Sequence, residues 1–115
     1  PKKMLCIGGG VIGLEFASIY NNLGAEVCVI EYGPQILGSA DLDAVKEYTK
    51  ALTKQGIKIE TSTRALGYAQ GSVGLDVRLE NMKTGEVRTE AFDLVLCAIG
   101  ALVFARLSPY FEDFL

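Results

Sequence analysis

The sequence contains no histidine and no tryptophan in its 115 residues. Without histidine the chain lacks the commonest general base and metal ligand, so a Ser-His or Cys-His nucleophile is excluded. No run of like charges occurs, and 14 acidic residues against 11 basic ones give a net charge of −3. Nucleic acid is therefore not an expected partner, because no basic face is present to neutralise its phosphates.

Long apolar segments are also absent. No run approaches the roughly 20 apolar residues that a membrane helix needs, so we expect a soluble protein with no membrane partner. The apolar start of the chain breaks at the three glycines from Gly8 onward, which excludes a signal-peptide core. Half of the residues are nevertheless hydrophobic, which is enough for one folded domain, and the length is too short for two.

Cysteine is scarce and unpaired. Cys6, Cys28 and Cys97 each lie in an apolar run, far apart in the sequence and without CxxC spacing. We interpret them as small buried core residues, with redox or zinc-binding groups as the alternative. An odd, unpaired set is typical of a reducing, intracellular compartment.

What the sequence does contain is an alternation of strand and helix patterns. Short apolar runs predict strands, and apolar side chains at helical spacing predict helices between them. These patterns occupy residues 3–7, 11–23, 26–31, 41–55 and 57–60. The order β-α-β-α-β with short connections predicts a parallel sheet.

The period changes from helical to alternating after residue 62. Three short strands at 65–70, 75–80 and 86–91, separated by turn residues, predict an antiparallel meander. Residues 93–99 are again continuously apolar, as a returning central parallel strand would be. The sequence therefore predicts an α/β fold, a Rossmann-type three-layer domain over residues 1–100 whose parallel sheet is interrupted by a β-meander crossover.

The most informative motif is the glycine turn between the first strand and the first helix. Gly8, Gly10 and Gly13 form a GxGxxG pattern. Gly8 permits a tight turn, Gly10 leaves room for a diphosphate to approach the backbone, and Gly13 lets the helix lie close to the strand. The free amides at the helix N-terminus would then face the phosphates, where the helix dipole favours negative charge.

An acid ends the second strand, 18 residues beyond Gly13. Glu31 can accept both ribose hydroxyls of an adenosine and would repel a 2′-phosphate, and no arginine occurs between Glu31 and Arg64 to offset it. The predicted cofactor is therefore NAD(H) rather than NADP(H). The alternatives are that the glycines build only a turn, with Glu31 solvated, or that the same fingerprint holds FAD. Glu15, in the first helical turn, is explained equally by the helix dipole and by a site near the nicotinamide.

Four segments, in order along the chain, resemble one family. They are GGGVIGLE at 8–15, LGAEVCVIE at 23–31, the loop with QIL at 35–37 followed by Asp41, and CAIG at 97–100. Together they are similar to the central NAD-binding domain of dihydrolipoamide dehydrogenase and its relatives among the flavin-dependent pyridine-nucleotide disulfide oxidoreductases. The resemblance covers residues 1–100, including the position of the meander.

The resemblance implies a nucleotide-binding role for seven residues: Gly8, Gly10, Ile12, Gly13, Glu15, Glu31 and Gly100. By the family's pattern the three motif glycines cradle the NAD diphosphate and Ile12 lies along the dinucleotide. Glu31 binds the adenosine ribose, Glu15 lies near the nicotinamide, and Gly100 lines the opposite wall of the cleft. In this family electrons pass from a dithiol through a disulfide and FAD to NAD. We expect an intracellular, reducing compartment, either the cytoplasm or the mitochondrial matrix.

The resemblance also has limits. The family has an FAD-binding domain with a redox cysteine pair before this segment and a dimerisation domain with a catalytic histidine after it. Neither occurs in these 115 residues, so we expect no catalytic residue, no metal site and no turnover by the chain alone. The predicted function is that of the NAD(H)-binding domain of a dihydrolipoamide dehydrogenase-like flavoprotein, and the alternative is a non-catalytic interaction module that retains the fold.

After Gly100 the family usually continues with arginine and then Pro-Asn, whereas this chain reads ALVFAR. We interpret residues 101–115 as a divergent, apolar C-terminal tail. We expect such a tail either to fold back over the sheet or, as we favour, to form an association surface for a second copy or a full-length homologue.

Overall fold

The computed structural model describes residues 2–38, 40–72, 74–99 and 102–107. Every helix and strand predicted up to residue 99 is present, with ends within two residues of those expected. In chain order the elements are β1 (Lys3–Ile7), α1 (Val11–Asn22), β2 (Glu26–Ile30), α2 (Leu42–Lys54), β3 (Lys58–Glu60), β4 (Thr63–Gln70), β5 (Leu75–Asn81), β6 (Val87–Phe92), β7 (Leu94–Ile99) and β8 (Leu102–Leu107).

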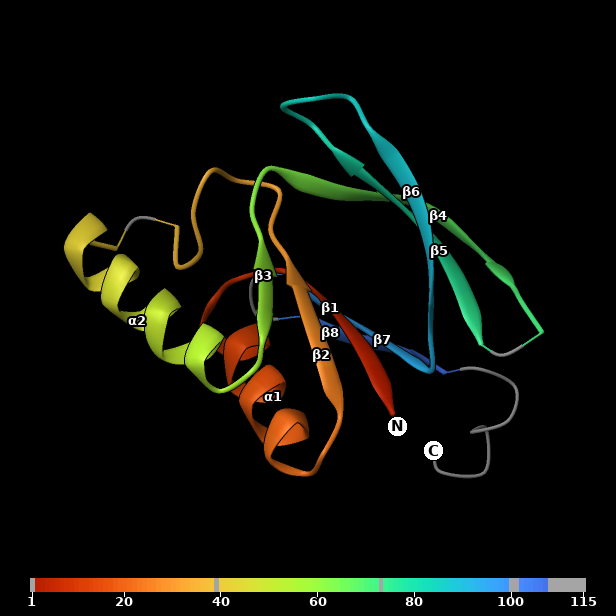
Figure 1. Cartoon of the computed structure of the whole chain (residues 1–115), viewed down its shortest axis with the longest axis horizontal. Helices are drawn as coiled ribbons and strands as arrows, with labels where there is room; N and C mark the ends of the chain where they lie inside the picture. The colour runs from red at the N-terminus through yellow and green to blue at the C-terminus, as the bar shows by residue number, and fades with distance from the viewer. Residues whose placement is uncertain (1, 39, 73, 100–101, 108–115) are drawn as a thin grey trace.

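The elements form three layers. A five-stranded sheet has the order β3-β2-β1-β7-β8, in which all strands except β8 are parallel, and β4-β5-β6 form a separate antiparallel sheet. Figure 1 shows α1 and α2 on one side of the larger sheet and the three-stranded sheet on the other. The predicted α/β fold, with an antiparallel meander between the third and last parallel strands, is confirmed.

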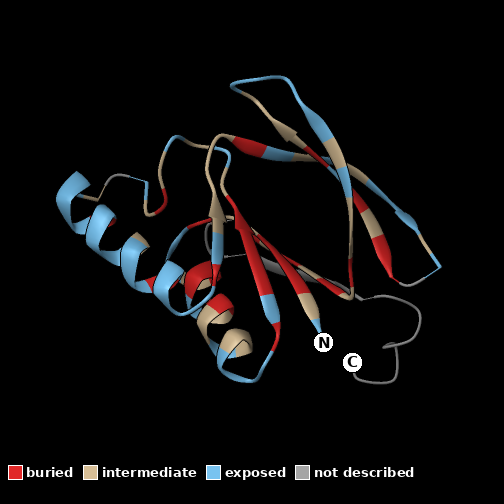
Figure 2. Ribbon diagram, viewed as in Figure 1, coloured by how far each residue is buried: buried red, intermediate tan, exposed pale blue. Residues whose placement is uncertain are grey.

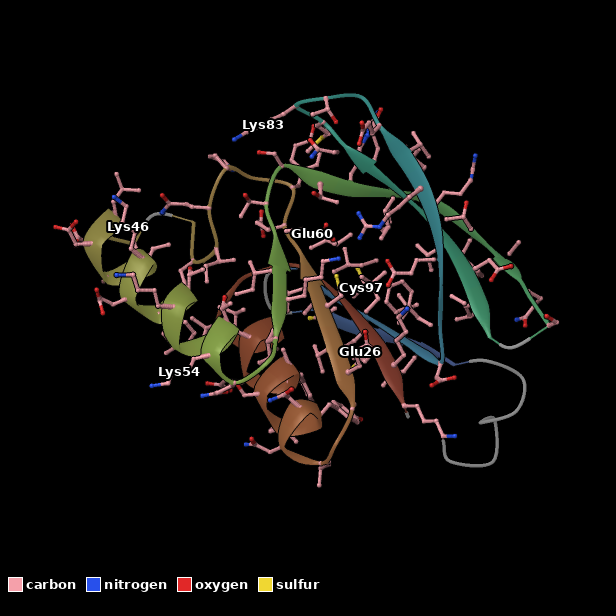
Figure 3. All side chains as sticks on the ribbon, viewed as in Figure 1. Glu26, Lys46, Lys54, Glu60, Lys83 and Cys97 are labelled. Carbon is pink, nitrogen blue, oxygen red and sulfur yellow. The ribbon has the colours of Figure 1, made fainter. Side chains whose placement is uncertain are left out.

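Two apolar clusters hold the layers together. On β1, Met4 and Cys6 pack towards the helices with Leu14 and Ala17, whereas Leu5 packs towards the three-stranded sheet. Because side chains alternate along a strand and both faces are covered, β1 has to be apolar throughout. Figure 2 accordingly shows buried residues concentrated in the inner strands and exposed residues along the outer side of α2. From that outer side Lys46 and Lys54 project into solvent (Figure 3).

Ion pairs add a polar link between the two sheets. Arg88 of β6 binds the Glu60 carboxylate of β3 through both guanidinium Nη atoms and the Glu90 carboxylate through Nε. The Nζ atom of Lys3, on β1, lies 2.9 Å from Glu90 Oε2. Glu60 lies between β3 and the three-stranded sheet (Figure 3). Burial acts to raise the pKa of both carboxyls. The hydrogen bonds and charges of basic neighbours outweigh it and lower both pKa values, through Arg88 and Lys58 at Glu60 and through Lys3 and Arg88 at Glu90. Both groups are therefore held as carboxylates.

The sheet continues beyond residue 100. Residues 102–107, which the sequence interpretation assigned to the tail, form β8 and pair antiparallel with β7. Sequence periodicity did not predict this edge strand. Residues 108–115, with the rest of the predicted association surface, lie outside the described residues. Neither described helix is long and apolar enough to cross a membrane.

Candidate functional site

A cleft of about 860 Å³ opens where β1 and β7 end and α1 begins. Its walls come from the glycine turn, the start of the loop after β2, the beginning of β4 and the end of β7. Ligands of open α/β sheets bind at the carboxyl ends of the strands. The volume also lies in the range typical of small-molecule sites.

The three motif glycines differ in what surrounds them. Gly8 has a φ of +114°, and a Cβ built there would lie 2.1 Å from the Ala98 carbonyl oxygen. A Cβ at Gly13 would lie 2.3 Å from the Gly8 carbonyl oxygen. At Gly10, by contrast, a Cβ would meet no atom within 4 Å among the described residues, and the φ of −81° suits any residue. Packing therefore requires glycine at 8 and 13 but not at 10, where the missing side chain keeps the start of α1 open.

The start of α1 also lacks a side-chain cap. Gly10 is its N-cap residue, and among the described residues no side chain accepts a hydrogen bond from its first amides. Helix α2 is different, because the Asp41 carboxylate accepts a hydrogen bond from the Ala44 amide. The first amides of an uncapped helix are unpaired donors at the positive end of its dipole. Since residues 10–13 line the cleft, these donors make it suitable for an anion.

The carboxylate of Glu31 is fixed next to the glycine turn by two backbone amides. Its Oε1 accepts a hydrogen bond from the Gly9 amide at 2.8 Å, and its Oε2 accepts one from the Gly33 amide at 2.7 Å. The loop after β2 is further attached to the turn, because the Leu37 amide donates to the Gly9 carbonyl at 2.7 Å. These bonds set the orientation of the acid at the edge of the cleft.

The structure brings five of the seven predicted site residues into the lining of this cleft: Gly8, Gly10, Ile12, Gly13 and Glu31. Glu15 is exposed on α1 and is not among the described lining residues. Gly100 lies outside the described residues. The individual roles of all seven in nucleotide binding stay predictions.

Several residues of the cleft were missed by the sequence interpretation, among them Tyr32, Arg64 and Cys97. Tyr32, 69% exposed, directly follows Glu31, and its position beside the acid was a signal that could have found it. Arg64 lies at the start of β4 and hydrogen-bonds Glu80. Cys97 on β7 is partly exposed in the cleft, although it was predicted to be a buried core residue. Sequence spacing alone could not predict that Arg64 and Cys97 line the same cleft.

The other two cysteines are core residues, as predicted. Burial raises the pKa of both Cys6 and Cys28 to about 12, so neither thiol is an effective nucleophile near neutral pH. The Cys6 thiol donates to the Gly13 carbonyl at 3.4 Å, which links β1 to α1 beneath the glycine turn. In the part of the chain that the structure describes, no three His, Cys, Asp or Glu side chains are grouped to hold a metal ion.

Known proteins resemble this chain in both sequence and fold. The family described as pyridine nucleotide-disulphide oxidoreductase matches residues 1–107. The dihydrolipoamide dehydrogenase of Chaetomium thermophilum is 46% identical over 107 residues, which is 92% of this chain and 21% of the relative. The mitochondrial dihydrolipoyl dehydrogenase of Schizosaccharomyces pombe is 42% identical over 106 residues, with the same two coverages. The chain spans about a fifth of the length of these relatives.

Solved structures agree with this relationship. A ferredoxin reductase from Rhodopseudomonas palustris superposes with a TM-score of 0.74 and 29% identity, over 89% of this chain and 24% of that one. The HOCl-induced flavoprotein disulfide reductase RclA from Escherichia coli gives a TM-score of 0.77 and 28% identity, over 87% and 22%. Since the family match covers nearly the whole chain and near relatives exceed 40% identity, the chain belongs to the pyridine nucleotide-disulphide oxidoreductases and resembles part of a dihydrolipoamide dehydrogenase.

Proposed function

We propose that this chain binds NAD(H), as the nicotinamide-nucleotide domain of a dihydrolipoamide dehydrogenase-like flavoprotein. The observation that carries the proposal is the convergence of two groups on one cleft. The uncapped start of α1, left open at Gly10, and the Glu31 carboxylate both face it. A dinucleotide has a partner for each, because its diphosphate suits the helix amides and its ribose hydroxyls suit the carboxylate.

The residues present fit such a ligand without a basic side chain at the diphosphate. The amides at residues 11–13 would donate to the diphosphate, and the space beside Gly10 would admit it. Each oxygen of Glu31 already accepts one backbone amide, but an ionised carboxylate offers about four acceptor sites. Glu31 can therefore accept the ribose hydroxyls without releasing Gly9 or Gly33.

A bound nicotinamide nucleotide supplies hydride transfer, whereas the residues of this chain bind and orient it. The chain has no histidine, and its buried thiols at Cys6 and Cys28 are protonated at neutral pH. We propose that oxidoreductase turnover requires a flavin and a redox disulfide from other parts of a longer flavoprotein. The corresponding compartment is the cytoplasm or the mitochondrial matrix, consistent with the mitochondrial relative described above.

An interaction module that retains the fold is the second candidate function. The observation that favours it is the exposed apolar surface at the end of α1, where Ile19 and the C-cap residue Leu23 are both more than half exposed. Large apolar side chains exposed next to each other are typical of a surface covered by a partner. Light scattering tests this candidate, since a chain that stays monomeric at every concentration would contradict self-association.

Titration of the purified chain with NADH, followed by nicotinamide fluorescence, tests the main proposal. We expect saturable but weak binding, because one open cleft buries only part of a dinucleotide. NADPH should bind more weakly because Glu31 repels its 2′-phosphate. No saturable binding at millimolar NADH would overturn the proposal. A yellow protein with flavin absorbance would instead assign the glycine turn to FAD.

A further inference from the structure

Two charged residues are among the described residues that line the cleft, Glu31 and Arg64. Their backbones lie close together, because the Thr63 amide donates to the Glu31 backbone carbonyl at 3.0 Å and Arg64 is the next residue. The start of β4 thus places an arginine in the lining of the same cleft as the acid assigned to the adenosine ribose. Guanidinium groups bind phosphate through two parallel hydrogen bonds, so an arginine at this end of the cleft bears on nucleotide choice.

The guanidinium of Arg64 is already engaged by a carboxylate. Arg64 and Glu80 are directly opposite each other on β4 and β5, and Arg64 Nε lies 2.5 Å from Glu80 Oε1. The side chain of Arg64 is 48% exposed, and ion pairs at such positions are weak. Glu80 therefore orients the guanidinium and competes only modestly with another anion for it.

We propose that Glu80 is a specificity-determining residue of the nucleotide cleft. It competes with the 2′-phosphate of NADP(H) for Arg64, while Glu31 repels the same phosphate directly. NAD(H) lacks this phosphate, so its binding is independent of the Arg64–Glu80 pair. The inference rests on the proposed function, because it concerns the adenosine end of the same cleft.

Fluorescence titration with NADH and with NADPH tests the inference on three proteins: the unmodified chain, Glu80→Gln and the double variant Arg64→Ala/Glu80→Gln. Glu80→Gln should raise NADPH affinity about fivefold, the upper range for an exposed pair, and leave NADH affinity within twofold. The double variant should lose the gain. Glu90→Gln is the matched control, because Glu90 also contacts an arginine, but that arginine, Arg88, is not among the described residues that line the cleft. It should change neither affinity.

The outcomes separate the two proposals. If NADH binds but Glu80→Gln leaves the NADPH-to-NADH affinity ratio unchanged, the role of Glu80 is refuted and the proposed function stands. A gain that persists in the double variant also refutes the role of Arg64. If the unmodified chain does not bind NADH, the proposed function itself fails. Thermal unfolding checks that each variant is folded; if Glu80→Gln is not, Arg64→Ala alone must leave NADPH affinity within twofold, and a larger loss refutes the inference.

Discussion

Replacing Gly10 by alanine separates nucleotide binding from folding. Gly10 has φ −81° and ψ −179°, and the new Cβ meets no described atom within 4 Å. Alanine at a compatible glycine site stabilises a protein by about 0.4–1 kcal/mol by restricting the unfolded chain. Alanine is a poorer N-cap than glycine by roughly 0.5 kcal/mol. The two effects nearly cancel, so the free energy of unfolding should change by less than about 0.5 kcal/mol.

Gly13→Ala is the matched change, three residues along the same helix. Its Cβ would lie 2.3 Å from the Gly8 carbonyl oxygen and 3.2 Å from Cys6 Sγ, so the backbone of the turn has to move. Overpacking of this kind costs about 1–3 kcal/mol. For a domain of this size each kcal/mol lowers the unfolding midpoint by about 4–8 °C.

The two variants should therefore differ in thermal stability, and Gly10→Ala should lose nucleotide binding without losing stability. Thermal unfolding should show Gly10→Ala unchanged and Gly13→Ala destabilised. NADH titration should show at least about a tenfold loss for Gly10→Ala, because its methyl group occupies the space beside the diphosphate. A Gly10→Ala protein that is folded and binds NADH like the unmodified chain would refute this reasoning, as would a destabilisation equal to that of Gly13→Ala.

The remaining predictions concern hydrogen bonds and ion pairs elsewhere in the fold and beside the cleft. Glu31→Ala leaves two partly buried amides without an acceptor, so it should cost about 1–3 kcal/mol in chemical denaturation and speed hydrogen exchange at Gly9 and Gly33; unchanged exchange would contradict the bonding described. Asp41→Ala removes the cap of α2 and should cost about 1 kcal/mol with NADH affinity unchanged; equal stability would contradict the cap. Because their folded pKa values are lowered, Glu60 and Glu90 stabilise the fold above about pH 4.5 and lose this contribution as the pH falls further. Chemical denaturation between pH 7 and pH 3 should show this loss of stability, and the loss should be smaller in Arg88→Met. Identical pH profiles for Arg88→Met and the unmodified chain would contradict the prediction.

The parts of the site that sequence could predict are those set by neighbouring residues. The glycine turn and Glu31 end adjacent parallel strands, so strand order alone brings them together. The same local geometry explains why packing requires glycine at position 13 but not at position 10. In these segments propensity, apolar pattern and turn chemistry all agree, which is why the elements were found.

The parts that sequence missed depend on contacts between distant elements. Arg64 reaches the cleft because β4 starts beside the loop after β2, and its pairing with Glu80 depends on the register of β4 and β5. Strand β8 follows directly on another apolar strand, so its pattern did not distinguish an edge strand from an association surface. Cys97 lies in a run of apolar residues, and it is partly exposed because it lies near the end of β7, where the cleft opens.

The central claim is that backbone amides at the start of α1 hold a diphosphate while Glu31 accepts the ribose. Amide chemical shifts of the ¹⁵N-labelled chain during titration with NADH test it most directly. We predict that the largest shifts occur at residues 9–13 and 31–33 and saturate together. Shifts confined to other residues, such as those of β5 and β6, or no shifts at millimolar NADH, would contradict it.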